Sequence, residues 1–182
     1  MKKNDARVRY TQKVLKDSLL QLLEKKPINK ITVKEVCEIA GINRATFYSH
    51  FSDCFDVLEK IENDLLEDFE KSLAYVNAAD VSELISAIYD MIDANAGICR
   101  VLVFHSKDSA LLTRMLGMAH DKTMSLWRRQ LKKASDAELE MLFICLSSGL
   151  MNVVVTGYQK FERSEVIKFV NDIARNSLRM YM

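Results

Sequence analysis

Residues 43–46, Asn-Arg-Ala-Thr, combine side chains that could read the edges of DNA bases. The guanidinium group of Arg44 can donate two parallel hydrogen bonds to one guanine. Small neighbours such as Ala45 let a protein backbone approach the floor of a groove. We therefore interpret Asn43, Arg44, Ala45 and Thr46 as the first turn of a base-reading helix.

A second group of polar residues could hold the sugar-phosphate backbone. Tyr48, Ser49 and His50 lie one turn after the base-reading candidates, and Thr32 begins the preceding segment. Hydroxyl and imidazole groups donate hydrogen bonds to phosphate oxygens, and these contacts fix the register of a protein on DNA. Basic residues near the N-terminus would add a salt-sensitive attraction that does not depend on base sequence. They are Lys2, Lys3, Arg7, Arg9 and Lys13.

Two short helices must position these residues. Thr32-Val33-Lys34-Glu35 has the spacing of a capping box, which predicts a helix that begins at Thr32. Gly41 suits the left-handed residue that ends such a helix, and Asn43 can cap the next helix, which we expect to continue through His50. An amphipathic helix over residues 7–26 precedes them. This layout is typical of a helix-turn-helix unit whose second helix enters the major groove.

The composition predicts an all-α protein. Only 5 Gly and 1 Pro occur in 182 residues, which leaves few residues for the tight turns of a sheet-rich fold. The net charge is +4 over residues 1–60 and −3 over residues 61–182, so a basic surface belongs to the first third. Later helices are predicted from Ser52-Asp53, from capping boxes at 80–83 and 135–138, and over residues 95–105 and 109–133.

The segment from Ile31 to Phe51 strongly resembles the N-terminal domain of TetR-family transcriptional regulators. The core of the likeness is Thr46-Phe47-Tyr48-x-His50-Phe51. The resemblance implies a three-helix helix-turn-helix DNA-binding domain, followed by a larger helical bundle that senses a ligand and dimerises. We expect these domains over residues 1–52 and 53–182. The likeness is specific over the first third of the chain, and the rest agrees by length and helix pattern.

The resemblance also implies roles for individual residues. Base-reading positions of the family fall on Arg44, Ala45 and Thr46, and phosphate-contacting positions fall on Thr32, Tyr48 and His50, with Asn43 and Ser49 nearby. Cys54 stands where the family usually has a lysine that holds a phosphate. At a helix N-terminus this cysteine could have a lowered pKa and act as a redox switch, and a small packed side chain is the alternative interpretation.

Large side chains in the middle of the chain are candidates for the wall of a ligand pocket. They are Tyr89, Phe104, Met115, Met118 and Trp127. Filling the core is the alternative role for such residues. Trp127 and Tyr89 join an apolar body to a polar group that could orient a ligand.

Two C-terminal segments carry apolar residues near the coiled-coil period. We predict that both pair with the same segments of a second subunit in a four-helix dimer interface. The candidate interface residues are Leu139, Leu142, Phe143, Leu146, Leu150, Val153, Val166, Phe169, Val170 and Ile173.

Residues 141–158 contain no charged residue and reach the lower length limit for a membrane span. Ser147, Ser148, Asn152 and Thr156 within this run argue against a membrane, and we expect a helix that is buried on two sides. No apolar stretch follows the basic N-terminus directly, so no signal peptide is predicted. The four cysteines lie far apart, as is usual for reduced thiols in the cytoplasm.

No catalytic motif, metal-ligand spacing or cofactor fingerprint is found, so we expect neither an enzyme nor a metal or cofactor site. We interpret the protein as a homodimeric repressor that binds a palindromic operator in double-stranded DNA and is released by a small-molecule effector. The alternative within the same fold is an activator or co-regulator that responds to a protein partner. A helical enzyme or a membrane-associated protein is the alternative from a different class.

Overall fold

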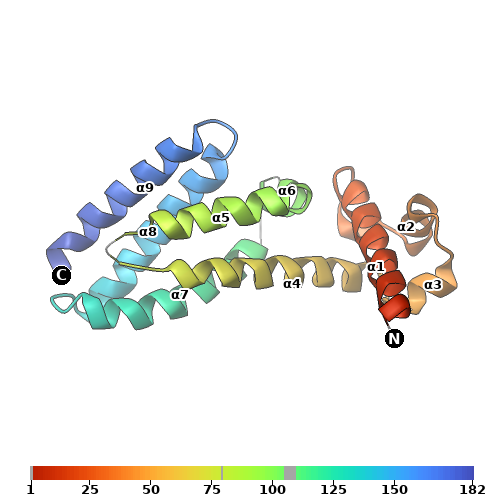
Figure 1. The fold of residues 1–182 in the computed structure, drawn as a ribbon, viewed down its shortest axis with the longest axis horizontal. Coiled ribbons are helices and arrows are strands. Elements are labelled where there is room, and N and C mark those ends of the chain that lie inside the picture. Colours follow the sequence, from red (N-terminus) through yellow and green to blue (C-terminus); the bar gives the residue numbers. More distant parts are fainter. Residues whose placement is uncertain (1, 79, 105–109) are drawn as a thin grey trace. The chain divides into compact units, whose positions relative to one another are not determined.

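The computed structural model describes residues 2–78, 80–104 and 110–182, and the regular secondary structure of this part of the chain is helical throughout (Figure 1). The chain forms two compact units, Met1–Leu65 and Leu66–Met182. Their boundary lies inside helix α4 (Cys54–Ser72) and not at the expected residues 52 and 53. The first turns of α4 belong to the first unit because Val57 and Ile61 are buried and Asp64 forms an ion pair with Lys16 at 2.6 Å.

The first unit is built from three helices that precede α4 and one short 3-10 segment. They are α1 (Lys2–Leu23), η1 (Ile28–Lys30), α2 (Val33–Ala40) and α3 (Arg44–Tyr48). Helix α2 packs against both α1 and α3. Leu15, Leu19, Val36 and Phe47 are completely buried. Helix α1 ends three residues before the expected position because the chain already turns ahead of Pro27, whose ring disfavours a helix in the residues before it.

Both ends of α2 follow the sequence prediction. The Thr32 hydroxyl accepts a hydrogen bond from the Glu35 amide, and the Glu35 carboxylate accepts one from the Thr32 amide at 3.0 Å, which is the predicted capping box. Gly41 ends the helix with φ 64°, in the left-handed region that a residue without Cβ adopts at little cost. Helix α3 ends at Tyr48, so Ser49 and His50 lie in the following turn and not in the helix as predicted.

The second unit holds the end of α4 and a bundle of longer helices. Its other elements are η2 (Leu73–Tyr75), α5 (Ser82–Ala94), α6 (Ala96–Cys99), the π-helical turn η3 (Arg100–Phe104), α7 (Ala110–Gln130), α8 (Asp136–Gly157), α9 (Arg163–Leu178) and η4 (Arg179–Tyr181). Within this unit α5 lies beside α9, and α8 packs against both α7 and α9 (Figure 1). Met124, Leu131, Leu139 and Leu178 form part of the buried core.

Of the two capping boxes predicted in this unit, one is confirmed and one is wrong. Ser135 and Glu138 form the expected capping box of α8. The box predicted at residues 80–83 is wrong, because the Asp80 carboxylate accepts from the Ser82 amide at 2.8 Å and α5 begins without a side-chain cap. The helix expected over residues 95–105 is divided into α6 and η3. His105 and Ser109, at the ends of two predicted helices, lie outside the described residues.

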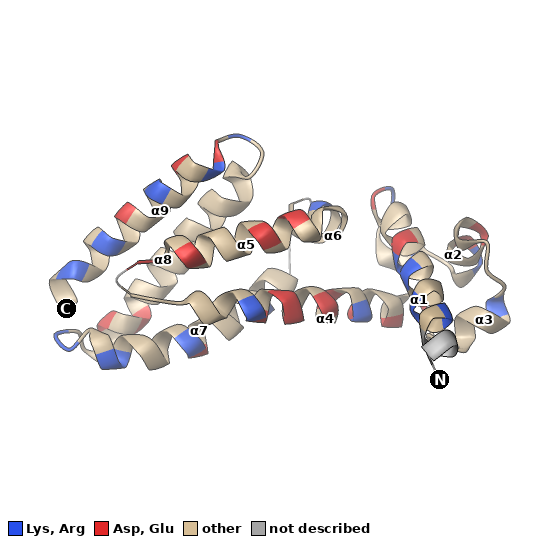
Figure 2. Cartoon of the chain, in the orientation of Figure 1, with Lys and Arg blue, Asp and Glu red and all other residues tan. Residues whose placement is uncertain are grey.

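Helix α8 carries its only three charged residues in its first turns (Figure 2). Among the described helices, it is the one long and apolar enough to cross a membrane, with a mean hydropathy of 1.8 and 22% of its most apolar window buried. One face of α8 packs in the core of its own unit, while Met141 and Ile144 on the other face are more than half exposed. The expected burial on two sides is therefore not found within a single chain.

His120 joins α7 to α8. One imidazole nitrogen lies 2.9 Å from the Glu140 carboxylate and the other lies 3.2 Å from Asp121, while the ring edge meets Phe143 at a centroid distance of 4.9 Å. Hydrogen bonds with Glu140 and then Asp121 raise the pKa of His120 above its ordinary value. The protonated imidazolium is therefore the form that stabilises the contact between these helices.

This raised pKa predicts a stability that depends on pH. The contribution of His120 is complete below the pKa of an unfolded histidine, about 6.5, and is lost as the pH rises through the higher folded value. We expect His120→Gln to be less stable than the unaltered protein at pH 6, by at most about 1 kcal/mol for such a partly exposed pair, and nearly equal at pH 9. Thermal unfolding at both pH values measures the difference. An equal loss at the two pH values would contradict this role.

Candidate functional site

The predicted base-reading residues form one exposed turn at the start of α3. Asn43, Arg44 and Ala45 are exposed and Thr46 is half-buried. The Asn43 carboxamide oxygen accepts a hydrogen bond from the Thr46 amide at 2.8 Å, so Asn43 is the predicted N-cap of the helix. This bond holds the turn in place and directs the Arg44 side chain to solvent. The turn can therefore present a cation and a small side chain to a groove together.

Buried aromatic rings hold α3 in the first unit. Phe47 is completely buried, and its ring meets the Phe51 ring at a centroid distance of 6.1 Å. The next residue, Tyr48, packs edge-on against Phe47 at 5.5 Å and still exposes 58% of its surface. Because Phe47 points into the core, the neighbouring Tyr48 points outward. The packing role predicted for Phe47 and Phe51 is confirmed.

The polar residues around α3 differ in what they can offer to a phosphate. Tyr48 is exposed and His50 is half-buried, so both can reach outward. The Ser49 hydroxyl instead donates to the Thr46 carbonyl at 2.7 Å. The Thr32 hydroxyl donates to the Glu35 carboxylate at 2.9 Å. Ser49 and Thr32 must therefore give up an internal hydrogen bond before their protons can reach a phosphate.

Lys26 compensates for the negative charge of Glu35 beside this surface. The Lys26 ammonium lies 2.6 Å from the Glu35 carboxylate. Hydrogen bonds from Lys26 and then Thr32 lower the pKa of Glu35 to about 2. The carboxylate therefore stays ionised as the capping group of α2, and its ion pair limits its repulsion of a nearby phosphate.

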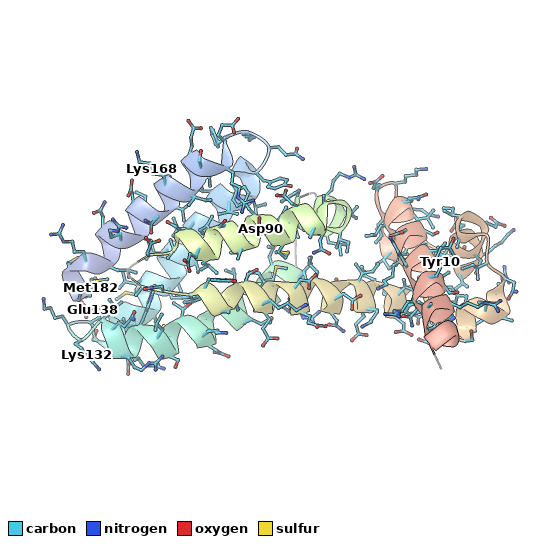
Figure 3. The ribbon with its side chains drawn as sticks, in the orientation of Figure 1. Tyr10, Asp90, Lys132, Glu138, Lys168 and Met182 are labelled. Carbon is cyan, nitrogen blue, oxygen red and sulfur yellow. The ribbon has the colours of Figure 1, made fainter. Side chains whose placement is uncertain are left out.

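Helix α1 contributes the basic residues of the first unit. Arg7, Arg9 and Lys13 are exposed, and Tyr10 between them exposes 70% of its surface (Figure 3). For Lys2 and Lys3, which we also predicted to attract DNA, the structure describes the backbone but not the side chains. The exposed cations agree with the basic charge balance of the N-terminal third.

A cavity of about 120 Å³ lies within the second unit. Side chains of α4, α5, α7, α8 and α9 line it. Of the five residues predicted for a ligand pocket, only Trp127 belongs to this wall. Sequence reasoning missed Phe69, Thr123 and Ser147, although Thr123 precedes Trp127 by one helical turn and Ser147 lies in the charge-free run.

The other four predicted pocket residues lie elsewhere. Tyr89 and Phe104 join Tyr158 in an aromatic cluster, with ring centroids 5.7 and 5.3 Å from the Tyr158 ring. Met115 is buried and Met118 is half-buried, and neither contributes to the cavity. The sequence shows which side chains are large, but the packing of α5 on α9 and of α7 on α8 decides which of them border empty space.

Several predicted dimer-interface residues are used inside their own subunit. Leu139, Phe143, Leu146, Val166 and Val170 are buried in the single chain. A second subunit cannot contact them directly without repacking this core. Leu142, Leu150 and Val153 are half-buried.

The opposite faces of the same two helices expose uncharged residues. On α8 these are Met141, Ile144, Cys145, Ser148 and Asn152, on α9 they are Phe169, Ile173 and Asn176, and Met180 follows in η4. We call them together the α8–α9 stripe. Phe169 and Ile173 belong to the predicted set and are both exposed.

Comparison with known proteins agrees with the motif in the first unit. Residues 17–59 match the family described as bacterial regulatory proteins, tetR family. A 59-residue segment is 36% identical to an uncharacterized HTH-type transcriptional regulator, YxbF, of Bacillus subtilis (strain 168). That segment covers 32% of this chain and 16% of the length of YxbF. The N-terminal segment of the chain therefore matches the DNA-binding domain of the TetR family.

Solved structures extend the TetR fold over both units. A TetR transcriptional regulator from Streptococcus agalactiae 2603V is similar with a TM-score of 0.69 and 21% identity, over 94% of this chain and 97% of the other. The dihydroxyacetone kinase operon activator DhaS is similar with a TM-score of 0.61 and 15% identity, over 94% and 97% of the two chains. The predicted all-α class and the order of the two domains are confirmed.

Cys54 is where the chain departs from the pattern of the TetR family, and the structure does not support a reactive thiol there. Cys54 begins α4 and is buried. Desolvation by burial, and then the charge of Asp53, raise the pKa of Cys54 to about 11. The redox interpretation required a lowered pKa, so the packed side chain is the role that this geometry supports. No cluster of three or more metal-ligating side chains is found within the described ranges.

The raised pKa of Cys54 predicts slow reaction with thiol reagents. In a Cys145→Ala variant, which removes the one exposed cysteine, we expect the remaining thiols to react with a disulfide reagent at pH 7.5 at least about a hundredfold slower than an unfolded cysteine. Absorbance of the released thiolate measures the rate, and unfolding in urea should restore full reactivity. A fast phase that disappears in Cys145→Ala/Cys54→Ala would show that Cys54 is reactive after all.

Proposed function

We propose that this protein is a cytoplasmic, dimeric repressor that binds a palindromic operator through α3 and leaves it when a small molecule occupies the second unit. The exposed first turn of α3 carries this proposal: Asn43 caps it, Phe47 anchors it, and Arg44 extends from it. A rigid, short helix with a projecting cation is suited to the major groove. Arg44 would read a guanine, while Tyr48 and His50 would contact phosphates.

A dimer is supported by the α8–α9 stripe. Ile144 exposes 63% of its surface and Phe169 exposes 52%, and no charged residue occurs in α8 after Glu140. Uncharged, half-exposed apolar residues on two adjacent helices favour association with the same surface of a second copy. Four helices would then form the interface, and the two α3 helices would bind half-sites related by the same two-fold axis.

Helix α4 is suited to carry a signal from the cavity. It is one continuous helix, with Val57 and Ile61 buried in the first unit and Phe69 in the wall of the cavity in the second. A ligand that displaces Phe69 would bias the position of α4, and a rigid helix transmits such a bias along its length. In this scheme the ligand shifts the dimer to a state that no longer fits the operator.

An activator is the second candidate. Its support is the likeness in fold to DhaS, which is described as an operon activator. A repressor and an activator would both contact DNA through α3 in the same way. An activator that responds to a protein partner would not need the cavity to be filled.

The direct test is a titration of fluorescent duplexes that tile the DNA upstream of the gene of this protein. Fluorescence anisotropy is measured near physiological salt with nonspecific competitor DNA. Tight binding to one duplex would support the proposal and provide the probe for an effector screen. Equal weak binding to every upstream and control duplex would contradict regulation at this region.

Substitutions on α3 should separate base reading from phosphate contact. Arg44→Ala should weaken operator binding by about 1–3 kcal/mol and relax the preference at one base pair, because a bidentate contact with guanine is lost. Tyr48→Phe removes only a hydroxyl and should weaken binding to all sequences by a similar factor. Anisotropy titrations with the operator and its single-base variants measure both effects. Equal loss of base discrimination in the two variants would contradict this division.

Charge placed in the α8–α9 stripe should break the dimer. We expect Ile144→Asp and Phe169→Asp to lower the mass in solution from about twice the 20.9 kDa of one chain to that of a monomer. The cause is the burial of unpaired carboxylates at the interface. Tyr75→Asp is the matched control, since Tyr75 is half-exposed in the second unit but lies outside α8 and α9. Light scattering coupled to size-exclusion chromatography measures the masses, and dimeric variants at both stripe positions would place the interface elsewhere.

A further inference from the structure

The wall of the cavity in the second unit has an unusual lack of charge. None of its described residues is Asp, Glu, Lys, Arg or His. Its aromatic members are Phe69, Trp127 and Phe143, and nearly all the others are aliphatic. An ion that entered this space would lose its hydration without gaining an opposite charge, which costs several kcal/mol. The cavity therefore disfavours carboxylates, phosphates and ammonium groups alike.

Two hydroxyl groups interrupt this apolar wall. Thr123 of α7 is only 9% exposed, and Ser147 of α8 is half-buried. Both residues line the cavity, where a hydroxyl can donate and accept hydrogen bonds. Asn77, the third polar residue of the wall, already has an interaction of its own. A hydroxyl at the border of an otherwise apolar space can fix the orientation of a ligand that carries one polar group.

The volume limits the size of that ligand. A cavity of about 150 Å³ with apolar walls in another protein holds one benzene molecule. The cavity here, at about 120 Å³, has room for an apolar body of a similar size. A ring or a short chain fits within this volume, whereas a long acyl chain would have to extend beyond it.

We infer that the effector is a small uncharged amphiphile, with an apolar body of about six carbons and one hydroxyl or carbonyl group. The hydroxyls of Thr123 and Ser147 bind its polar group, and the rings of Phe69, Trp127 and Phe143 surround its apolar body. This inference rests on the proposed function, in which an effector occupies this cavity. It adds the chemical class of that effector.

The single tryptophan of the chain allows a test without DNA, because Trp127 lies in the wall of the cavity. Full-length protein at pH 7.5 is titrated with hexanol, hexanoate and hexylamine, which share one chain and are neutral, anionic and cationic at this pH. Trp127 fluorescence should saturate with hexanol, and the two ions should bind at least tenfold more weakly. Equal affinity for all three compounds, or no saturable binding of hexanol, would overturn the inference.

Three variants test where hexanol binds. Thr123→Val keeps the shape of the side chain and should weaken hexanol binding by about two- to tenfold, the range for one lost hydrogen bond. Ala119→Leu extends a residue of the wall into the cavity and should abolish binding. Thr11→Val is the matched control, since Thr11 is equally buried but belongs to the first unit. Unchanged affinity in Thr123→Val and Ala119→Leu would overturn the assignment, and circular dichroism verifies that each variant is folded.

The result of the hexanol titration does not depend on the result of the DNA titration. Selective binding of hexanol without specific DNA binding would support the ligand class and contradict the proposed regulator. Specific DNA binding by a protein that does not bind hexanol would support the regulator and contradict the ligand class. If the protein binds both hexanol and a specific duplex, release of that duplex by hexanol but not by hexanoate would show that the two binding events are linked.

Discussion

A five-residue helix is not stable by itself, because helices shorter than about twelve residues are marginal in water. Helix α3 therefore depends on the burial of Phe47, which has no exposed surface, and on its contact with Phe51. The Asn43 cap adds one hydrogen bond to an otherwise unsatisfied amide. The exposed positions of Arg44 and Tyr48 follow from this anchor, since neighbouring residues of a short helix point in fixed and different directions. The candidate DNA surface is thus a consequence of one buried ring.

Polar groups next to this anchor serve two purposes. Thr32, Ser49 and Asn43 all form local hydrogen bonds that begin or end a helix. The same groups have the chemistry to contact phosphate, so DNA binding would exchange internal bonds for external ones. Such an exchange lowers the net gain from each contact and makes the fully available side chains, Arg44 and Tyr48, the more important ones.

The second unit divides its apolar residues among a core, a cavity and an exposed stripe. Helix α8 contributes to all three: Leu139 is in the core, Ser147 is in the cavity wall, and Ile144 is in the stripe. This explains why a single helix can carry so little charge after its first turns. An ordinary surface helix would have polar residues on its outer face. Here that face is uncharged, which is suited to a partner subunit.

The sequence by itself determined much of the local structure and the likeness of the first unit to the TetR family. The capping residues Thr32, Asn43 and Ser135 and the terminating Gly41 act through neighbours within a few positions, so their spacing predicted them, although the same spacing at residues 80–83 did not form a capping box. The same is true of the motif around Phe47, which lies in the segment that matches the TetR family. Only the tertiary structure decided which large side chains border the cavity, which faces of α8 and α9 remain exposed, and whether Cys54 is ionised. These properties depend on helices distant in sequence and on the loss of solvent around each group, and the local sequence pattern does not contain that information. Of these large side chains, Trp127 lies in the wall of the cavity, whereas Tyr89 and Phe104 lie in a separate aromatic cluster.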